Sequence, residues 1–125
     1  MYTAQEQANH RNIVADALES GKYQQGHGML HSIDCNQSYF CCLGVAIEVF
    51  ISRGGKLIKD CKGDYYNYND NSTFLPEEVR DWLGFTKSWG EYIGSSLVSD
   101  NDITRLTFKQ IAEKFRNPPE GLCVQ

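Results

Sequence analysis

The chain has 125 residues and a formal net charge of −4 at pH 7, and 41% of its residues are hydrophobic while 22% are charged. This length favours one domain with a modest core, and no apolar stretch reaches the roughly 18 residues that a transmembrane helix needs. The acidic balance, without any run of Lys and Arg, argues against a DNA or RNA strand as the partner, because proteins that bind such strands usually carry a basic stripe.

The N-terminal residues predict a helix. The run MYTAQEQANHRN has no basic head followed by an apolar core, so it does not read as a secretory signal peptide, and we expect a cytoplasmic protein. Thr3-Ala4-Gln5-Glu6 is a capping-box pattern, in which the Thr hydroxyl and the Glu carboxylate accept hydrogen bonds from free backbone amides. Apolar residues at positions 13, 14, 17 and 18 follow at helical spacing, and Gly21 is placed to end the helix.

A glycine-rich segment, GKYQQGHGMLHS, comes next. Three glycines in the eight residues from Gly21 to Gly28 exclude a regular element there. We expect a shaped loop that leads into a short strand at about residues 29–33. Asp34-Cys35-Asn36-Gln37 is then typical of a turn.

The run SYFCCLGVAIEVF (residues 38–50) predicts a helix that is buried on nearly all sides. We expect Ser38 to cap this helix and Tyr39 to begin it, with its end near Ser52. Gly44 costs about 1 kcal/mol of helix propensity relative to Ala, and we interpret it as the point where another backbone segment approaches closely.

The middle of the chain predicts a hairpin and a short helix. Residues 56–59 and 65–68 are two strand-like runs joined across a turn at 61–64. Leu75-Pro76-Glu77-Glu78 begins a helix, because proline occupies its first position and two acids face the positive end of its dipole. Gly84 ends this helix, and residues 86–96 are expected to be irregular.

The last stretch, LVSDNDITRLTFKQIAEKF, predicts a strand end at Leu97-Val98, a polar turn at 99–102 and a final helix. Thr107-Phe108-Lys109-Gln110 is the second capping box, and Asn117-Pro118-Pro119 ends the helix. The fold class expected from these elements is α+β. Residues 1–117 form a small single domain with about four helices around a buried central helix and a short antiparallel β-hairpin, and residues 118–125 form a loose tail.

The adjacent cysteines Cys41 and Cys42 have two readings. Free cysteine packs well in cores as a small hydrophobe. Alternatively, Cys41 at a helix N-terminus is a thiolate nucleophile with His27 or His31 as its base, but the histidine of papain-like enzymes normally follows the cysteine in the chain, and here none does. A zinc site that combines a histidine with Cys35, Cys41 or Cys42 lacks the usual ligand spacing. We therefore expect core packing, with no metal and no cofactor.

Three segments offer groups that recognise a small anionic nucleotide ligand. The glycine loop supplies backbone amides for phosphate, the acids and amide at 100–102 suit base or ribose edges, and the loop aromatics offer stacking surfaces. Each segment also has a structural reading, as a connector, an Asx turn or a second core layer. The predicted ligand-binding residues are Lys22, Tyr23, Gln25, Gly26, His27, Tyr66, Trp89, Asn101, Asp102 and Arg105.

Four motifs in a fixed order resemble a family of small, largely uncharacterised proteins common in phages and prophages. They are SGKYQQGHGML, FCCLGV, LPEEVRDWLGF and the ND…F..IA series of SDNDITRLTFKQIA, and together they span about residues 17–115. The resemblance implies a phage context, in which small acidic proteins act on host defence. We expect a non-enzymatic protein that sequesters, without cleaving it, a nucleotide-derived immune signal such as a cyclic oligonucleotide or a cyclic ADP-ribose isomer. Because such traps usually form closed assemblies, we also expect a homo-oligomer in the host cytoplasm.

Two other function classes stay open. The first is an inhibitor that docks on a host defence protein through its aromatic residues, and it predicts a host protein in a pull-down without small-molecule binding. The second is a cysteine-dependent hydrolase that rests on Cys41 and a histidine. It predicts an alkylatable Cys41 and loss of activity in Cys41→Ala.

Overall fold

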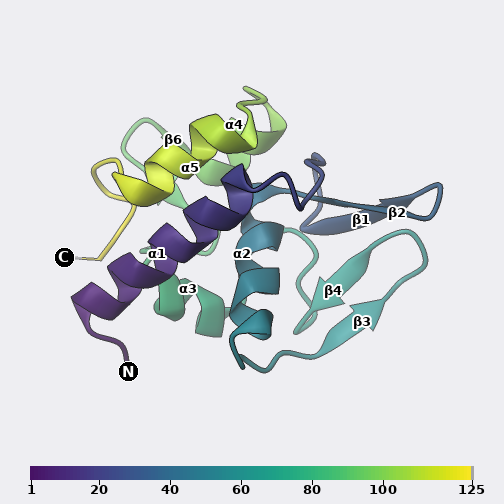
Figure 1. Ribbon diagram of the computed structural model, residues 1–125, viewed down its shortest axis with the longest axis horizontal. Coiled ribbons are helices and arrows are strands. Elements are labelled where there is room, and N and C mark those ends of the chain that lie inside the picture. Colours follow the sequence, from purple (N-terminus) through teal and green to yellow (C-terminus); the bar gives the residue numbers. More distant parts are fainter. Residues whose placement is uncertain (125) are drawn as a thin grey trace.

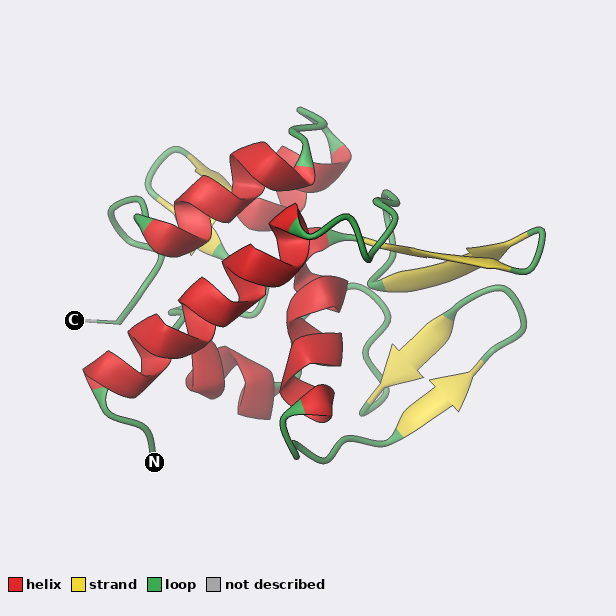
Figure 2. Ribbon diagram, viewed as in Figure 1, coloured by secondary structure: helices red, strands yellow, loops and turns green. Residues whose placement is uncertain are grey.

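This computed structural model describes residues 1–124. Within them the chain forms five helices and three short antiparallel hairpins (Figures 1 and 2). The helices are α1 (Ala4–Glu19), α2 (Cys42–Ser52), α3 (Glu77–Leu83), α4 (Leu97–Asp102) and α5 (Phe108–Arg116). The hairpins pair β1 (His31–Asp34) with β2 (Gln37–Phe40), β3 (Lys59–Cys61) with β4 (Tyr66–Tyr68), and β5 (Glu91–Tyr92) with β6 (Ser95–Ser96). The α+β fold class is confirmed. None of these helices combines the length and the apolarity that a membrane span requires.

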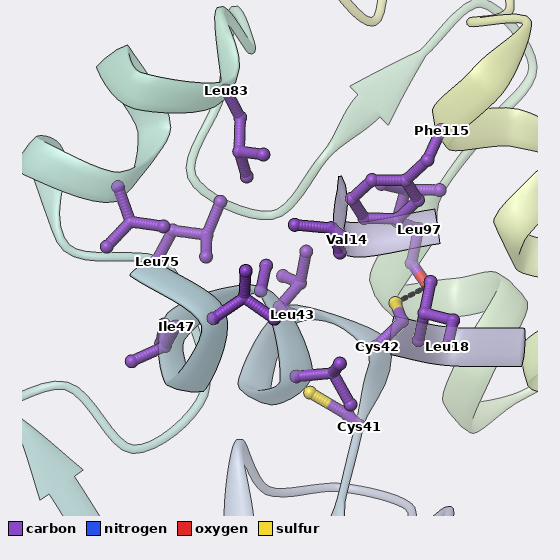
Figure 3. Close-up of a cluster of buried hydrophobic side chains, with 14 of the residues drawn as sticks. Val14, Leu18, Cys41, Cys42, Leu43, Ile47, Leu75, Leu83, Leu97 and Phe115 are labelled. Carbon is purple, nitrogen blue, oxygen red and sulfur yellow. Dashed lines mark hydrogen bonds between the residues drawn. The ribbon is translucent and has the colours of Figure 1, made fainter. Parts of the chain in front are cut away.

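Helix α2 lies at the centre of the core, as expected from its sequence. Every residue from Cys42 to Ile47 is buried, and α1, α3 and α4 all pack against this helix. Figure 3 shows side chains from these helices meeting around Leu43 and Val14, with Phe115 of α5 reaching in from the far end. Helix α1 also packs along α5, so the first and last helices of the chain lie side by side (Figure 1).

Local capping signals place the ends of three helices where the sequence predicts them. The Thr3 hydroxyl accepts from Glu6 N at 3.1 Å while Glu6 Oε1 accepts from Thr3 N at 2.8 Å, and Thr107 and Gln110 repeat this reciprocal pair at 3.2 and 2.8 Å. Gly84 ends α3 with a φ of 77°, a left-handed conformation that glycine adopts without a steric penalty.

Gly44 is the point of close backbone approach that the sequence suggested. A Cβ atom built on it would lie 1.8 Å from the carbonyl oxygen of Leu30. The same oxygen accepts a hydrogen bond from Cys41 N at 3.3 Å. Any side chain at position 44 therefore pushes the segment before β1 away from the first turn of α2.

The start of α2 differs from the prediction. Residues 37–40 form strand β2 rather than the first turn of a helix capped by Ser38, and the helix begins at Cys42 with Cys41 as its N-cap. Partners far along the chain decide this, because Phe40 N donates to Gln24 O at 2.8 Å and Phe40 O accepts from Gly26 N at 2.7 Å. Pairing with β1 also holds residues 37–40 in an extended conformation, so the apolar pattern alone placed the helix start three residues too early.

Two further segments are more ordered than predicted. Residues 97–102 form helix α4 instead of a strand end and a turn, and the Ser96 hydroxyl caps it by accepting from Ser99 N at 3.0 Å. The segment from 86 to 96, expected to be irregular, contains the short β5–β6 hairpin.

The tail is not loose over residues 118–124. Leu122 is fully buried, its carbonyl accepts from Thr86 N at 2.9 Å, and Val124 N donates to Gly84 O at 2.9 Å. Residue 125 of the predicted tail lies outside the described residues. The segment after α5 therefore packs on the loop that follows α3.

Candidate functional site

Asn101, at the end of α4, is the centre of a buried polar cluster. Its Oδ1 accepts from Gln25 Nε2 at 2.9 Å and from Cys42 N at 3.2 Å, and its Nδ2 donates to Gly26 O and to Asp102 Oδ1, both at 2.8 Å. An amide side chain offers two donors and two acceptor positions, and all four are used here. Since its exposed fraction is 0%, Asn101 has neither the access nor the spare hydrogen-bonding capacity to contact a ligand.

Two more contacts complete this cluster, which we call the Asn101 clamp. Gly28 N donates to Asp102 Oδ1 at 2.9 Å, and Gln25 Nε2 also donates to Leu106 O at 2.8 Å. The clamp therefore ties the glycine loop to the first turn of α2 and to the end of α4. Three pairs from the sequence motifs meet here: Gln25-Gly26, Cys41-Cys42 and Asn101-Asp102. Their shared role in the structure is to hold three segments together.

Four of the predicted ligand residues thus lie together, but they bind one another: Gln25, Gly26, Asn101 and Asp102. The other six are spread over several elements. Lys22, His27 and Arg105 are exposed, while Tyr23, Tyr66 and Trp89 are half-buried.

The half-buried tyrosines of this set pack against aromatic neighbours. Tyr23 meets Phe40 edge-on at 5.2 Å between ring centroids, and burial raises the pKa of its hydroxyl. Tyr66 stacks on His31 at 4.4 Å. These tyrosines belong to a second core layer beneath the hairpins, one of the two roles that the sequence left open for its aromatics.

Trp89 faces a different environment, an open apolar hollow of about 410 Å³. The Trp89 and Phe74 rings lie 5.8 Å apart at an angle of 53°. Phe74 is 42% exposed and Ile103 is 79% exposed, and with Trp89 they form an exposed apolar patch. The hollow is lined by Phe74, Trp89, Ser96, Val98, Ser99 and Ile103.

Sequence reasoning found only Trp89 of this aromatic hollow. Val98, Ser99 and Ile103 line it because α4 is a helix, whereas the sequence predicted a strand end and a turn at these positions. The signal that was available is Ser96, a favourable N-cap residue three positions before Ser99.

Two exposed cations flank the aromatic hollow along the chain. Lys87 precedes Trp89 by two residues, and Arg105 follows Ile103 by two residues. Neither takes part in an ion pair within residues 1–124. Neither residue belongs to the lining itself, so the cations are neighbours of the hollow in sequence.

A second, larger hollow of about 550 Å³ lies between the first residues of the chain and α3. Glu78 and Asp81 contribute to its lining, together with Met1, Tyr2 and Gln7. Two carboxylates repel an anionic ligand, so the aromatic hollow is the better site for a nucleotide despite its smaller volume.

The cysteine pair is buried in the core. Cys41 is 4% exposed and Cys42 is fully buried, with its thiol donating weakly to Leu97 O at 3.7 Å (Figure 3). Burial raises the pKa of Cys41 to about 12 and that of Cys42 well above its usual value. A nucleophilic cysteine needs access and a lowered pKa, so this environment speaks against Cys41 as a catalytic residue. Within residues 1–124, no three His, Cys, Asp or Glu side chains gather in a way that would hold a metal ion.

The model of one protein family, described as a domain of unknown function (DUF8296), matches residues 7–118. The chain belongs to this family. Comparisons with curated proteins and with solved structures found no match. The matched range takes in the whole Asn101 clamp and every residue that lines the aromatic hollow.

Proposed function

We propose that the protein is a phage-type counter-defence protein that binds a nucleotide-derived immune signal and sequesters it without cleaving it. The observation that carries the proposal is the aromatic hollow, in which Phe74 and Trp89 lie side by side with Ile103 exposed near them. The signal belongs to the class of cyclic oligonucleotides or cyclic ADP-ribose isomers, and its base lies in the hollow.

The size and lining of the hollow support a flat, apolar occupant. Its volume of about 410 Å³ falls in the range of about 300–1,000 Å³ that is typical of small-molecule sites. Stacking of a base on an aromatic side chain contributes about 1–3 kcal/mol and tolerates any base, because every base has a π-face. The lining is almost entirely apolar, which suits the face of a base rather than its polar edge.

Lys87 and Arg105 supply the charge that the phosphates of such a ligand need. Arg pairs with phosphate through two parallel hydrogen bonds, and Lys acts as a point charge. In a chain with a net charge of −4, two cations that are close to the hollow residues in sequence favour a small anion over a nucleic-acid strand. Of the ten residues predicted from the sequence, Trp89 and Arg105 remain ligand contacts in this proposal.

Tryptophan fluorescence tests the proposal directly. Of the two tryptophans, Trp82 is buried and stacks on His10 at 4.2 Å, whereas Trp89 lines the hollow. A base that stacks on Trp89 should quench part of the emission and leave the Trp82 part unchanged. The probes are cyclic dinucleotides and cyclic ADP-ribose isomers, and mass spectrometry of the recovered probe should show it intact.

Matched variants separate the hollow from general surface effects. Ile103→Glu should abolish quenching, while Ile58→Glu, at a position with a similar exposed fraction of 76% outside the hollow, should leave it unchanged. Replacing both Lys87 and Arg105 with Gln should weaken binding about tenfold or more and reduce its salt dependence, whereas Lys56→Gln should have no effect.

A second readout is thermal stability. A ligand present at about 100 times its dissociation constant should add about 2.7 kcal/mol to the free energy of unfolding. Absence of both quenching and stabilisation across the probe set would refute the proposal. In that case a pull-down from host lysate, with Ile103→Glu as the control bait, tests the alternative of an inhibitor that docks on a host protein.

A further inference from the structure

A continuous chain of hydrogen bonds runs from the surface of the first hairpin into the core. His31 begins β1 and is 4% exposed, with its ring between Phe40 and Tyr66 at centroid distances of 4.2 and 4.4 Å. Its Nε2 lies 2.7 Å from Ser38 Oγ on the paired strand β2, and its Nδ1 lies 2.9 Å from the hydroxyl oxygen of Tyr68 on β4.

The hydrogen bond between Tyr68 and Glu48 determines which atom is the donor in each of the other hydrogen bonds of this series. Tyr68 has one hydroxyl proton and donates it to Glu48 Oε2 at 2.6 Å, since a carboxylate only accepts. The Tyr68 oxygen must therefore accept from His31, which places the imidazole proton on Nδ1. In the neutral ring Nε2 then carries a lone pair, and it accepts the hydroxyl proton of Ser38.

The imidazole is held in its neutral form. Burial lowers the pKa of His31 to about 4, and the nearby Lys59 ammonium acts in the same direction while the Glu48 carboxylate opposes both. Lys59 Nζ also lies 3.1 Å from Glu48 Oε2. His31 is thus a fixed, deprotonated acceptor aimed at an exposed hydroxyl, and the arrangement serine–base–orienting group is the one that activates nucleophiles.

We propose that Ser38 is a nucleophile activated by His31, and that it accepts an acyl group from small activated esters. Ser38 Oγ bonds to the ester carbonyl carbon while its proton moves to His31 Nε2. The carbon–oxygen bond to the leaving group then breaks, and the departing alkoxide takes the proton from Nε2. The products are acylated Ser38 and a free alcohol, with His31 restored. Tyr68 and Glu48 are positioning residues.

This site is independent of the proposed ligand site, because the chain Ser38–His31–Tyr68–Glu48 shares no residue with the aromatic hollow. General-base catalysis contributes about 10²–10⁴-fold when the base is well matched to the working pH. A base with a pKa of about 4 is weaker than free imidazole, so an acceleration near the lower end, about 100-fold, is expected.

Labelling with a fluorophosphonate and with p-nitrophenyl acetate tests the proposal. The chain contains its own controls, since Ser20 and Ser52 are also exposed but donate their hydroxyl protons to Ala17 O and Val49 O at 2.6 and 2.7 Å. Peptide mass spectrometry should find the label on Ser38 about 100-fold faster than on either control serine. Ser38→Ala should remove this fast label and leave the slow labelling of the controls unchanged.

The pH profile distinguishes activation from mere exposure. With His31 already deprotonated, the labelling rate of Ser38 should be nearly constant from about pH 5 to 8, whereas an unassisted hydroxyl reacts about tenfold faster per pH unit. Tyr68→Phe keeps the ring but removes the acceptor for Nδ1–H, and should slow Ser38 labelling about tenfold without changing the control serines. Labelling of Ser38 no faster than of Ser20 and Ser52, or a rate that rises tenfold per pH unit, would overturn the proposal.

Discussion

Gly44→Ala changes the free energy of unfolding in two opposite ways: it improves helix propensity and it worsens packing. Alanine favours a helix interior by about 1 kcal/mol over glycine. Its Cβ, however, would lie 1.8 Å from Leu30 O and 2.7 Å from Leu30 C, far below the 3.0 Å that real Cβ contacts respect. The segment that contains Leu30 must therefore move by about 1.2 Å relative to α2, and both atoms are backbone atoms that cannot rotate away.

The cost of that movement exceeds the gain. Overpacking of a core costs about 1–3 kcal/mol, and displacing Leu30 O also weakens its hydrogen bond with Cys41 N, at about 1 kcal/mol. After the helix-propensity gain, we expect Gly44→Ala to lower the free energy of unfolding by about 1–3 kcal/mol. For a domain of this size a loss of about 2 kcal/mol lowers the melting temperature by roughly 6–10 °C.

Urea unfolding followed by tryptophan fluorescence measures this change, and Gly54→Ala is the control. Gly54 follows α2 with a φ of 94° and has nothing within 4 Å of an added Cβ, so its substitution tests backbone strain alone, worth about 1 kcal/mol. A Gly44→Ala protein as stable as the wild type, or more stable, would show that helix propensity prevails and would refute the close approach of Leu30.

Three further predictions concern the clamp, the thiols and the buried histidine. Asn101→Leu should lower the free energy of unfolding by about 2–4 kcal/mol in urea, because several buried groups lose their hydrogen-bond partner; a loss below about 1 kcal/mol would contradict the clamp. Iodoacetamide at about pH 8 should alkylate the exposed cysteines Cys35 and Cys61 in the native protein but leave Cys41 unmodified until denaturant is added, and rapid native alkylation of Cys41, seen by peptide mass spectrometry, would revive the hydrolase reading. His31 has a pKa of about 4 when folded and 6.5 as the reference value for the unfolded chain. Between pH 4 and 6.5 the unfolded chain binds a proton at His31 and the folded protein does not. The free energy of unfolding should therefore fall as the pH is lowered from 6.5 to about 4, and His31 should cause no pH dependence above 6.5. Thermal melts across this range should show a smaller pH slope for His31→Leu than for the wild type, and equal slopes would contradict the assignment.

Signals that act within a few residues were predictable from sequence. The capping boxes at Thr3 and Thr107 and the left-handed Gly84 satisfy backbone groups that lie within one turn of them. Gly44 was also informative, because a glycine inside an otherwise apolar helix costs stability unless something needs the space. The caps and Gly84 act on their own stretch of chain, whereas Gly44 shows that a close approach occurs without showing which segment makes it.

The errors occur where distant segments decide the local structure. Residues 37–40 carry a helix-compatible apolar pattern, yet they form β2 because β1 and the glycine loop supply backbone partners. The segment after α5 begins with a proline pair and looks like a loose tail, yet Leu122 is buried against the loop after α3. No single-sequence pattern reports partners that lie this far away.

The candidate site divides in the same way. The sequence identified Gln25, Asn101 and Asp102 as exceptional polar residues. It did not reveal that they hydrogen-bond to one another, which leaves these groups unavailable to a ligand. The aromatic hollow was largely missed because Phe74 and Ile103 are far apart in sequence, and the fold alone brings them to one hollow. Trp89 was found because a loop aromatic outside every predicted core face stands out.

The Asn101 clamp has a consequence for how the chain is made. Apart from the bond between the neighbours Asn101 and Asp102, its hydrogen bonds join residues 59 to 81 positions apart. Helix α1 likewise lies along α5 from the other end of the domain. While a ribosome is still adding residues before α4, the glycine loop lacks its partners on α4 and α1 has an uncovered apolar side. Productive folding therefore waits until nearly the whole domain has emerged, and these long-range contacts between the two ends of the domain predict that the nascent chain needs protection until then.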